Sequence, residues 1–91
     1  MARTVKCPAG QWTAVFNHAF VQMPNAWTVS FTAADGGSFT GEVAEKRSSW
    51  IFRKPPTTLA LADVMDFRRG WWNTFYSVRV KPTRDVIAQI R

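Results

Sequence analysis

Hydrophobic and polar residues alternate with a period of two in several short stretches of the chain, a pattern typical of strands that bury one face. The clearest stretch is 26–34, where Trp27, Val29, Phe31 and Ala33 alternate with threonine and serine. The same alternation is found in four further stretches, at residues 11–18, 39–43, 49–54 and 73–81. In the first of these it places Trp12, Ala14 and Phe16 on one face. These patterns predict five short strands.

Turn residues separate these stretches. Asp35-Gly36-Gly37 tolerates positive φ, so we expect a β-hairpin that joins 26–34 to the stretch beginning at Phe39. Proline ends other stretches because it lacks an amide donor, as at Pro24, at Pro55-Pro56 and at Pro82.

The segment before the last strand carries the signals of a helix. Asp63 suits the cap at the start, Arg68 and Arg69 suit the last turn, and Gly70 suits the position after the end. We therefore predict one short helix near residues 63–69.

Together these elements predict a mainly β fold. The expected architecture is a small antiparallel β-barrel or sandwich of five or six short strands with one short helix. Residues 11–81 form the single β-rich domain, residues 1–10 are an N-terminal arm, and residues 82–91 are a C-terminal arm or an edge strand.

Composition supports a folded protein in a reducing compartment. The 91 residues are 46% hydrophobic and include five Trp and seven Phe, enough large side chains for one core. Cys7 is the one cysteine, so no intrachain disulfide forms, and we interpret it as a buried free thiol. The sequence has neither a signal-peptide core nor a run long enough to span a membrane. We expect a cytoplasmic protein, or one assembled into a particle such as a virion.

Charge is distributed unevenly along the chain. The net charge is +6, and no lysine or arginine lies within residues 7–45. Such an asymmetry indicates a surface for a negatively charged partner. Two segments, 46–54 and 67–72, interleave cations with aromatic rings, as single-stranded nucleic-acid sites do. The alternative is that the rings of these segments belong to the core and the cations to solvated turns.

Adjacent tryptophans are harder to bury together. In an extended chain Trp71 and Trp72 point to opposite sides, so we expect one of them to be exposed unless both pack beneath a helix or an arm. Tryptophan and arginine are enriched at binding hot spots. The candidate interaction residues are Arg68, Arg69, Trp71, Trp72, Lys46, Arg47, Arg53, Lys54, Arg79 and Lys81.

Catalytic and metal-binding motifs are not found in the sequence. His18, Cys7 and six carboxylates stand in no spacing associated with an active site. We predict no enzyme, no cofactor, no metal and no small-molecule substrate.

Three functions remain. The first is a non-enzymatic structural module, such as a small viral or phage virion subunit, that self-associates or docks to a protein partner through aromatic surface and arms. The second is a single-stranded nucleic-acid-binding domain of OB or SH3-like type. The third is a protein inhibitor of a nucleic-acid-handling enzyme.

Overall fold

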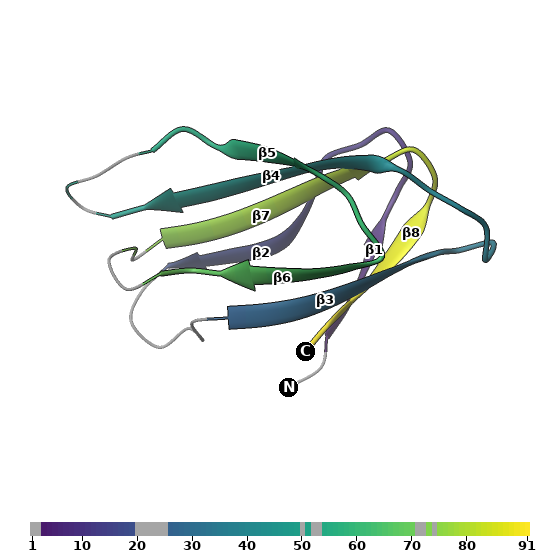
Figure 1. Cartoon of the computed structure of the whole chain (residues 1–91), viewed down its shortest axis with the longest axis horizontal. Helices are drawn as coiled ribbons and strands as arrows, with labels where there is room; N and C mark the ends of the chain where they lie inside the picture. The colour runs from purple at the N-terminus through teal and green to yellow at the C-terminus, as the bar shows by residue number, and fades with distance from the viewer. Residues whose placement is uncertain (1–2, 20–25, 50, 52–53, 71–72, 74) are drawn as a thin grey trace.

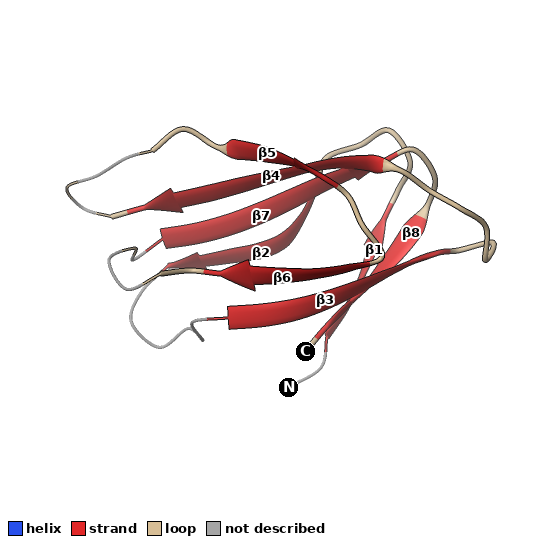
Figure 2. Ribbon diagram, viewed as in Figure 1, coloured by secondary structure: helices blue, strands red, loops and turns tan. Residues whose placement is uncertain are grey.

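The computed structural model describes residues 3–19, 26–49, 51, 54–70, 73 and 75–91. These residues form eight strands in two four-stranded antiparallel sheets, and they include no helix (Figure 1; Figure 2). Sheet A contains, in spatial order, β1 (Arg3–Cys7), β8 (Val86–Ile90), β3 (Ala26–Ala33) and β6 (Val64–Arg68). Sheet B contains β2 (Thr13–Ala19), β7 (Phe75–Pro82), β4 (Gly41–Ser48) and β5 (Thr57–Ala60).

The order of the strands follows a nested pairing. β1 pairs with β8, β2 with β7, β3 with β6 and β4 with β5, so the chain resembles one long hairpin centred on the β4–β5 connection. Two further pairings, β3 with β8 and β4 with β7, roll this hairpin into two sheets. An eight-stranded, double-sheet arrangement of this kind is a jelly roll.

The core lies between the sheets and is built from alternate residues of their inner strands. In β3 the side chains of Trp27, Val29, Phe31 and Ala33 are buried, which confirms the predicted face of this strand. Four rings pack together at the centre of this core, those of Phe16, Trp27, Phe67 and Tyr76. Their centroids lie 4.7 to 6.4 Å apart, within the range of favourable aromatic pairs.

The observed sandwich differs from the predicted fold in several respects. In the described part of the chain neither sheet closes into a barrel, and the strands there number eight instead of five or six. Residues 3–7 and 86–90, predicted to lie in arms, are strands β1 and β8, which pair with each other. β8 is moreover an inner strand of sheet A, between β1 and β3, and not an edge strand.

The helix predicted near residues 63–69 is wrong, because this segment is strand β6. Phe67 is 1% exposed and Met65 also packs against the core, so a period of two, and not of 3.6, buries the apolar side chains. Asp66 accepts a hydrogen bond of 2.8 Å from Thr28 on the neighbouring strand instead of occupying a first helical turn. Gly70 does have positive φ, at 84°, but it follows a strand.

The hairpin predicted at Asp35-Gly36-Gly37 is wrong in its pairing. The turn is present, with Gly36 at φ 77° and its amide donating to the Ala33 carbonyl at 3.0 Å. The strands on either side of it, however, belong to different sheets. The turn residues therefore carry the chain from one layer of the sandwich to the other.

β2 is confirmed as a strand, but its faces are not those predicted. A register shift between Ala14 and Phe16 marks a β-bulge, and it lets the consecutive residues Val15 and Phe16 both turn inward. Ala14 is exposed, and so is Trp12, at 44%. The bulge breaks the alternation on which the prediction rested.

Candidate functional site

Five strands end or begin at the same end of the sandwich. β2, β4 and β6 end there and β3 and β7 begin there, at the left of Figure 1. The registers agree with this view, because Phe75 at the start of β7 is paired with both Ala19 and Ser48, the last residues of β2 and β4. In the other sheet Ala26 is paired with Arg68. We call this the connection end.

Cations gather at the connection end. They are Lys46 and Arg47 near the end of β4, Lys54 in the β4–β5 connection, and Arg68 and Arg69 at the end of β6. Two acids lie near these cations: Glu45, which is buried and bonded to Arg47, and Asp66, which is exposed two residues before Arg68 and accepts a hydrogen bond from Thr28. Because five cations stand against two acids, the described part of the connection end keeps a net positive charge.

The opposite end of the sandwich holds most of the acids but is nearly neutral, because Lys6, Lys81 and Arg84 lie there as well. Asp35, Asp63 and Asp85 lie in the connections at that end, and Glu42 lies at the start of β4. The basic residue Arg84 forms an ion pair with Asp35 at 3.2 Å. The longest dimension of the molecule is 42 Å, several times the Debye length of about 8 Å at physiological ionic strength. The acids of the far end therefore do not screen the connection end.

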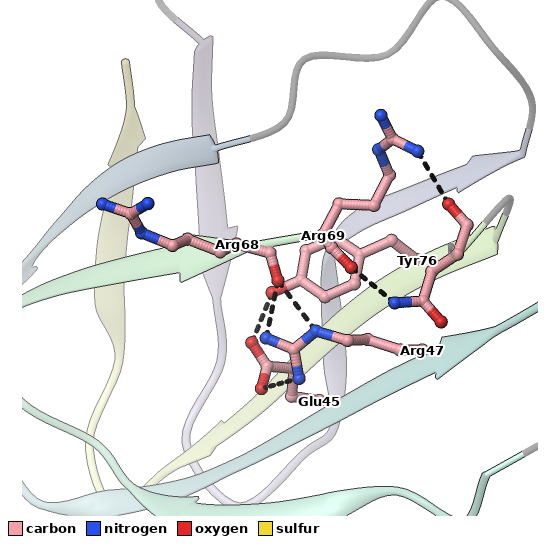
Figure 3. A network of polar contacts seen from close by, with 6 residues as sticks. Glu45, Arg47, Arg68, Arg69 and Tyr76 are labelled. Carbon is pink, nitrogen blue, oxygen red and sulfur yellow. Dashed lines mark hydrogen bonds and ion pairs between the residues drawn. The ribbon is translucent and has the colours of Figure 1, made fainter. Parts of the chain in front are cut away.

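A buried polar network lies behind the connection end (Figure 3). Glu45 is 7% exposed, and its carboxylate accepts hydrogen bonds from the hydroxyl of Tyr76 and, at 2.7 Å, from Nη1 of Arg47. Nε and Nη2 of Arg47 donate to the backbone carbonyl of Arg68 at 2.8 and 2.6 Å. Because Arg47 belongs to sheet B and Arg68 to sheet A, this side chain ties the two layers together.

The same network changes the ionisation of the tyrosine. Burial, the hydrogen bond to Glu45 and the negative charge of Glu45 raise the pKa of Tyr76, and the positive charge of Arg47 offsets part of this rise. The guanidinium of Arg47 also lies 5.3 Å from the centroid of the Tyr76 ring, in the geometry of a cation–π contact. The phenol therefore stays protonated and donates to the carboxylate.

Arg69 and Asn73 hold the two ends of the β6–β7 connection together. Nη1 of Arg69 donates to the Asn73 carbonyl at 2.7 Å, and Nδ2 of Asn73 donates to the Arg69 carbonyl at 2.7 Å. Gly70 between them has positive φ, and a Cβ there would lie 3.0 Å from Nδ2 of Asn73. Arg69 is thus occupied in shaping the connection.

The candidate residues predicted from the sequence fall into three groups. Lys46, Lys54 and Arg68 are exposed at the connection end, whereas Arg47 and Arg69 are half-buried in the contacts described above. Arg79 and Lys81 lie on β7, away from this end, opposite Ala44 and Glu42 of β4. Arg53, Trp71 and Trp72 lie outside the described residues.

Sequence reasoning missed Glu45, Tyr76 and Asn73. A signal for the first was available, because Glu45 stands two residues after Val43 and two before Arg47, in phase with the inward face of its strand. An acid at an inward position with an arginine two residues away predicts a buried ion pair.

Cys7 is buried, and burial raises the pKa of its thiol to about 11. The thiol is therefore protonated and inert at neutral pH. It borders a hollow of about 370 Å³ at the end opposite the connection end, and this hollow is lined mainly by apolar atoms. The carboxylate of Asp85, at the rim, already accepts the amide of Ala9 at 2.8 Å.

Within the described part of the chain, no three side chains of His, Cys, Asp or Glu stand close enough to hold a metal ion. None of the described segments is a helix long and apolar enough to cross a membrane.

Comparison of the chain with protein families, with curated proteins and with solved structures finds no match. The fold is therefore assigned from the strand order alone.

Proposed function

We propose that this protein is a non-enzymatic assembly subunit of a larger particle, and that it docks to an acidic protein surface through its connection end. The observation that carries the proposal is the polarity of the sandwich. Lys46, Lys54 and Arg68 are exposed at one end, whereas Asp35, Asp63 and Asp85 offset the cations at the other end.

The fold supports an assembly role by analogy. Jelly rolls are used by viral capsid proteins, and also by lectins and by cupins. A fold alone does not assign a function. The analogy therefore agrees with an assembly role but does not establish one. The analogy is consistent with the sequence, in which no residues stand in a spacing associated with an active site.

The architecture of the docking end suits a specific interface. The Glu45–Arg47–Tyr76 network and the Arg69–Asn73 pair fix the strand ends from which the exposed cations project. Cations on a rigid base lose less conformational entropy on binding than cations on loose chain. Charge complementarity of this kind mainly sets orientation and the rate of encounter.

A second candidate is single-stranded nucleic acid. The sequences that join β2 to β3, β4 to β5 and β6 to β7 contain five aromatic residues in addition to their cations, namely Phe20, Trp50, Phe52, Trp71 and Trp72. Rings that stack on bases beside cations that neutralise phosphates are typical of such sites. The polarity of the sandwich fits this partner as well as an acidic protein.

Two double variants with equal changes in charge test the docking end. Lys54→Glu with Arg68→Glu reverses two exposed cations at the connection end and spares the Arg68 carbonyl that Arg47 uses. The control, Lys6→Glu with Arg84→Glu, reverses two exposed cations on other parts of the surface. Each tagged variant is expressed in the native source, and the fraction that sediments with large assemblies is measured.

We expect the wild type and the control to sediment with the assembly and the connection-end variant to remain with free protein, although all three have similar melting temperatures. Equal sedimentation of the two variants would contradict docking through this end. Nuclease treatment before sedimentation separates the two partners. Release of the wild type by nuclease would replace the protein partner with nucleic acid, whereas retention supports the proposal.

A further inference from the structure

The sandwich has four edge strands, and one of them differs from the others. An edge strand presents unpaired backbone groups, and proteins usually protect it with charges, bulges or cover. β1 carries Arg3 and Lys6, β6 carries Asp66 and Arg68, and β2 contains a bulge. β5 has no charge and a continuous register with β4, and all four of its residues are exposed.

The pairing of β5 shows which of its amides are free. The amide of Leu61 donates to the Gly41 carbonyl at 3.0 Å, so these two residues form a hydrogen-bonded pair of the β4–β5 ladder. Such pairs alternate along an antiparallel ladder, so Leu59 is bonded to β4, while the amides of Thr58 and Ala60 point to the open edge. β5 thus offers two donors in the spacing of a strand.

The side chains of β5 are also incompletely covered. Leu59 is paired with Val43, whose side chain is fully buried, yet Leu59 itself is 38% exposed. The inner face of sheet B is therefore left open at this edge. A strand added beside β5 would cover more of Leu59 and satisfy the free amides.

Charge identifies the partner that fits this edge. Each chain carries a net charge of +6, so two copies repel each other over most of their surfaces. Residues 55–62 contain no charged side chain, and this segment includes the whole of β5. Two copies that meet at β5 bring no like charges of this segment together, and an identical edge is self-complementary across a two-fold axis.

We propose that β5 pairs antiparallel with β5 of a second copy, which joins the two copies of sheet B into one continuous sheet. Pro55 and Pro56 limit the new ladder on one side because neither supplies an amide. The contact uses a strand edge and not the exposed cations of the connection end. It goes beyond the proposed function, and either could fail without the other.

Substitutions at Thr58 test the pairing. Thr58→Pro removes a free-edge amide and spares the ladder with β4, and proline is tolerated on edge strands at such positions. Thr58→Val is the matched control, because it keeps the amide and the β-branched shape. The mass of each full-length protein is measured by light scattering over a series of concentrations, and its fold by circular dichroism.

We expect the wild type and Thr58→Val to change from the mass of one chain to that of two as concentration rises. Thr58→Pro loses one hydrogen bond per copy, so its dimer Kd rises by about tenfold or more. A wild type that remains a single chain throughout would overturn the proposal, and so would a folded Thr58→Pro with the same Kd as the wild type.

Hydrogen exchange on the wild type keeps the test decisive if Thr58→Pro does not fold. The amides of Thr58 and Ala60 should exchange more slowly at high concentration than at low concentration, while the amides of Val64 and Asp66, which point to the open edge of β6, do not change. Doubling of the mass without slower exchange at Thr58 and Ala60 would place the contact elsewhere and refute the pairing.

Discussion

Tyr76→Phe is the sharpest test of the buried network that joins the two sheets. Tyr76 is 1% exposed, and its hydroxyl donates to the carboxylate of Glu45. The substitution keeps the ring in the aromatic cluster and leaves Glu45 with Arg47 alone. A hydrogen bond to a charged group contributes about 1.5–3 kcal/mol, so we expect the free energy of unfolding to fall by this amount at neutral pH.

The effect should depend on pH with a defined sign. The pKa of Tyr76 is raised in the folded protein, whereas the unfolded chain loses the phenolic proton near its ordinary pKa of about 10. Stability from this group is therefore complete below about pH 10 and falls by about 1.4 kcal/mol per pH unit above it. The Phe variant lacks this loss, so the difference between the two proteins narrows at high pH.

The chain has one tyrosine, which makes the assay specific. Urea unfolding, followed by tryptophan fluorescence from about pH 7 to about pH 11, gives the two free energies, and phenolate absorbance reports the ionisation of Tyr76 directly. Burial raises the pKa of Cys7 to about 11, so this thiol adds its own loss of stability above its ordinary pKa, which cancels in the difference between the variants. A constant difference across this range, or phenolate formation near pH 10 in the folded protein, would refute the reasoning.

Two further substitutions test the packing of the core. Trp27→Ala empties the centre of the aromatic cluster, where the indole lies 4.7 Å from the ring of Phe16 and 5.3 Å from that of Tyr76, and should cost about 3–5 kcal/mol in urea unfolding. A loss of less than about 1 kcal/mol would mean that the indole does not fill the core. Gly41→Ala places a Cβ 2.7 Å from the Lys81 carbonyl, which is backbone and cannot turn aside, so it should cost about 1–3 kcal/mol. An unchanged melting temperature would show that the strands separate freely there.

The sequence predicts the inner strands well because burial of one face imposes alternation. β3 is recognised from Trp27 to Ala33, and the stretch at 73–81 corresponds to β7, where Tyr76, Val78 and Val80 are buried. The pattern identifies a strand but says nothing about its partner. Asp35-Gly36-Gly37 therefore predicted a hairpin where the chain crosses between sheets.

Other errors arise because one residue type serves several structures. Asp63 and Gly70 suit the ends of a helix, but they equally bound a short strand, and β6 contains only two core-facing apolar residues, Met65 and Phe67, to reveal its period. β1 and β8 were missed as a pair because each is short and its partner is at the other end of the chain. Long-range pairing of this kind has no local signal.

The candidate site could be predicted only in part. The described parts of the two segments in which cations and rings interleave do meet at one end of the sandwich, where Arg47 donates to the Arg68 carbonyl. The sequence could not show that Arg47 would reach the Arg68 carbonyl, since that contact depends on how the two sheets pack, or that Arg69 would be engaged by Asn73 across the β6–β7 connection. Exposed and structural arginines look alike until the fold is known.

The mass and the nucleic-acid content of the complex that holds this protein in its native source test the central claim most directly. Light scattering combined with absorbance at two wavelengths measures both in one experiment. If the protein is an assembly subunit that docks to another protein, the complex should have a mass many times that of one chain. Its absorbance ratio should be that of protein without nucleic acid. A complex with the mass of a single chain would contradict the account.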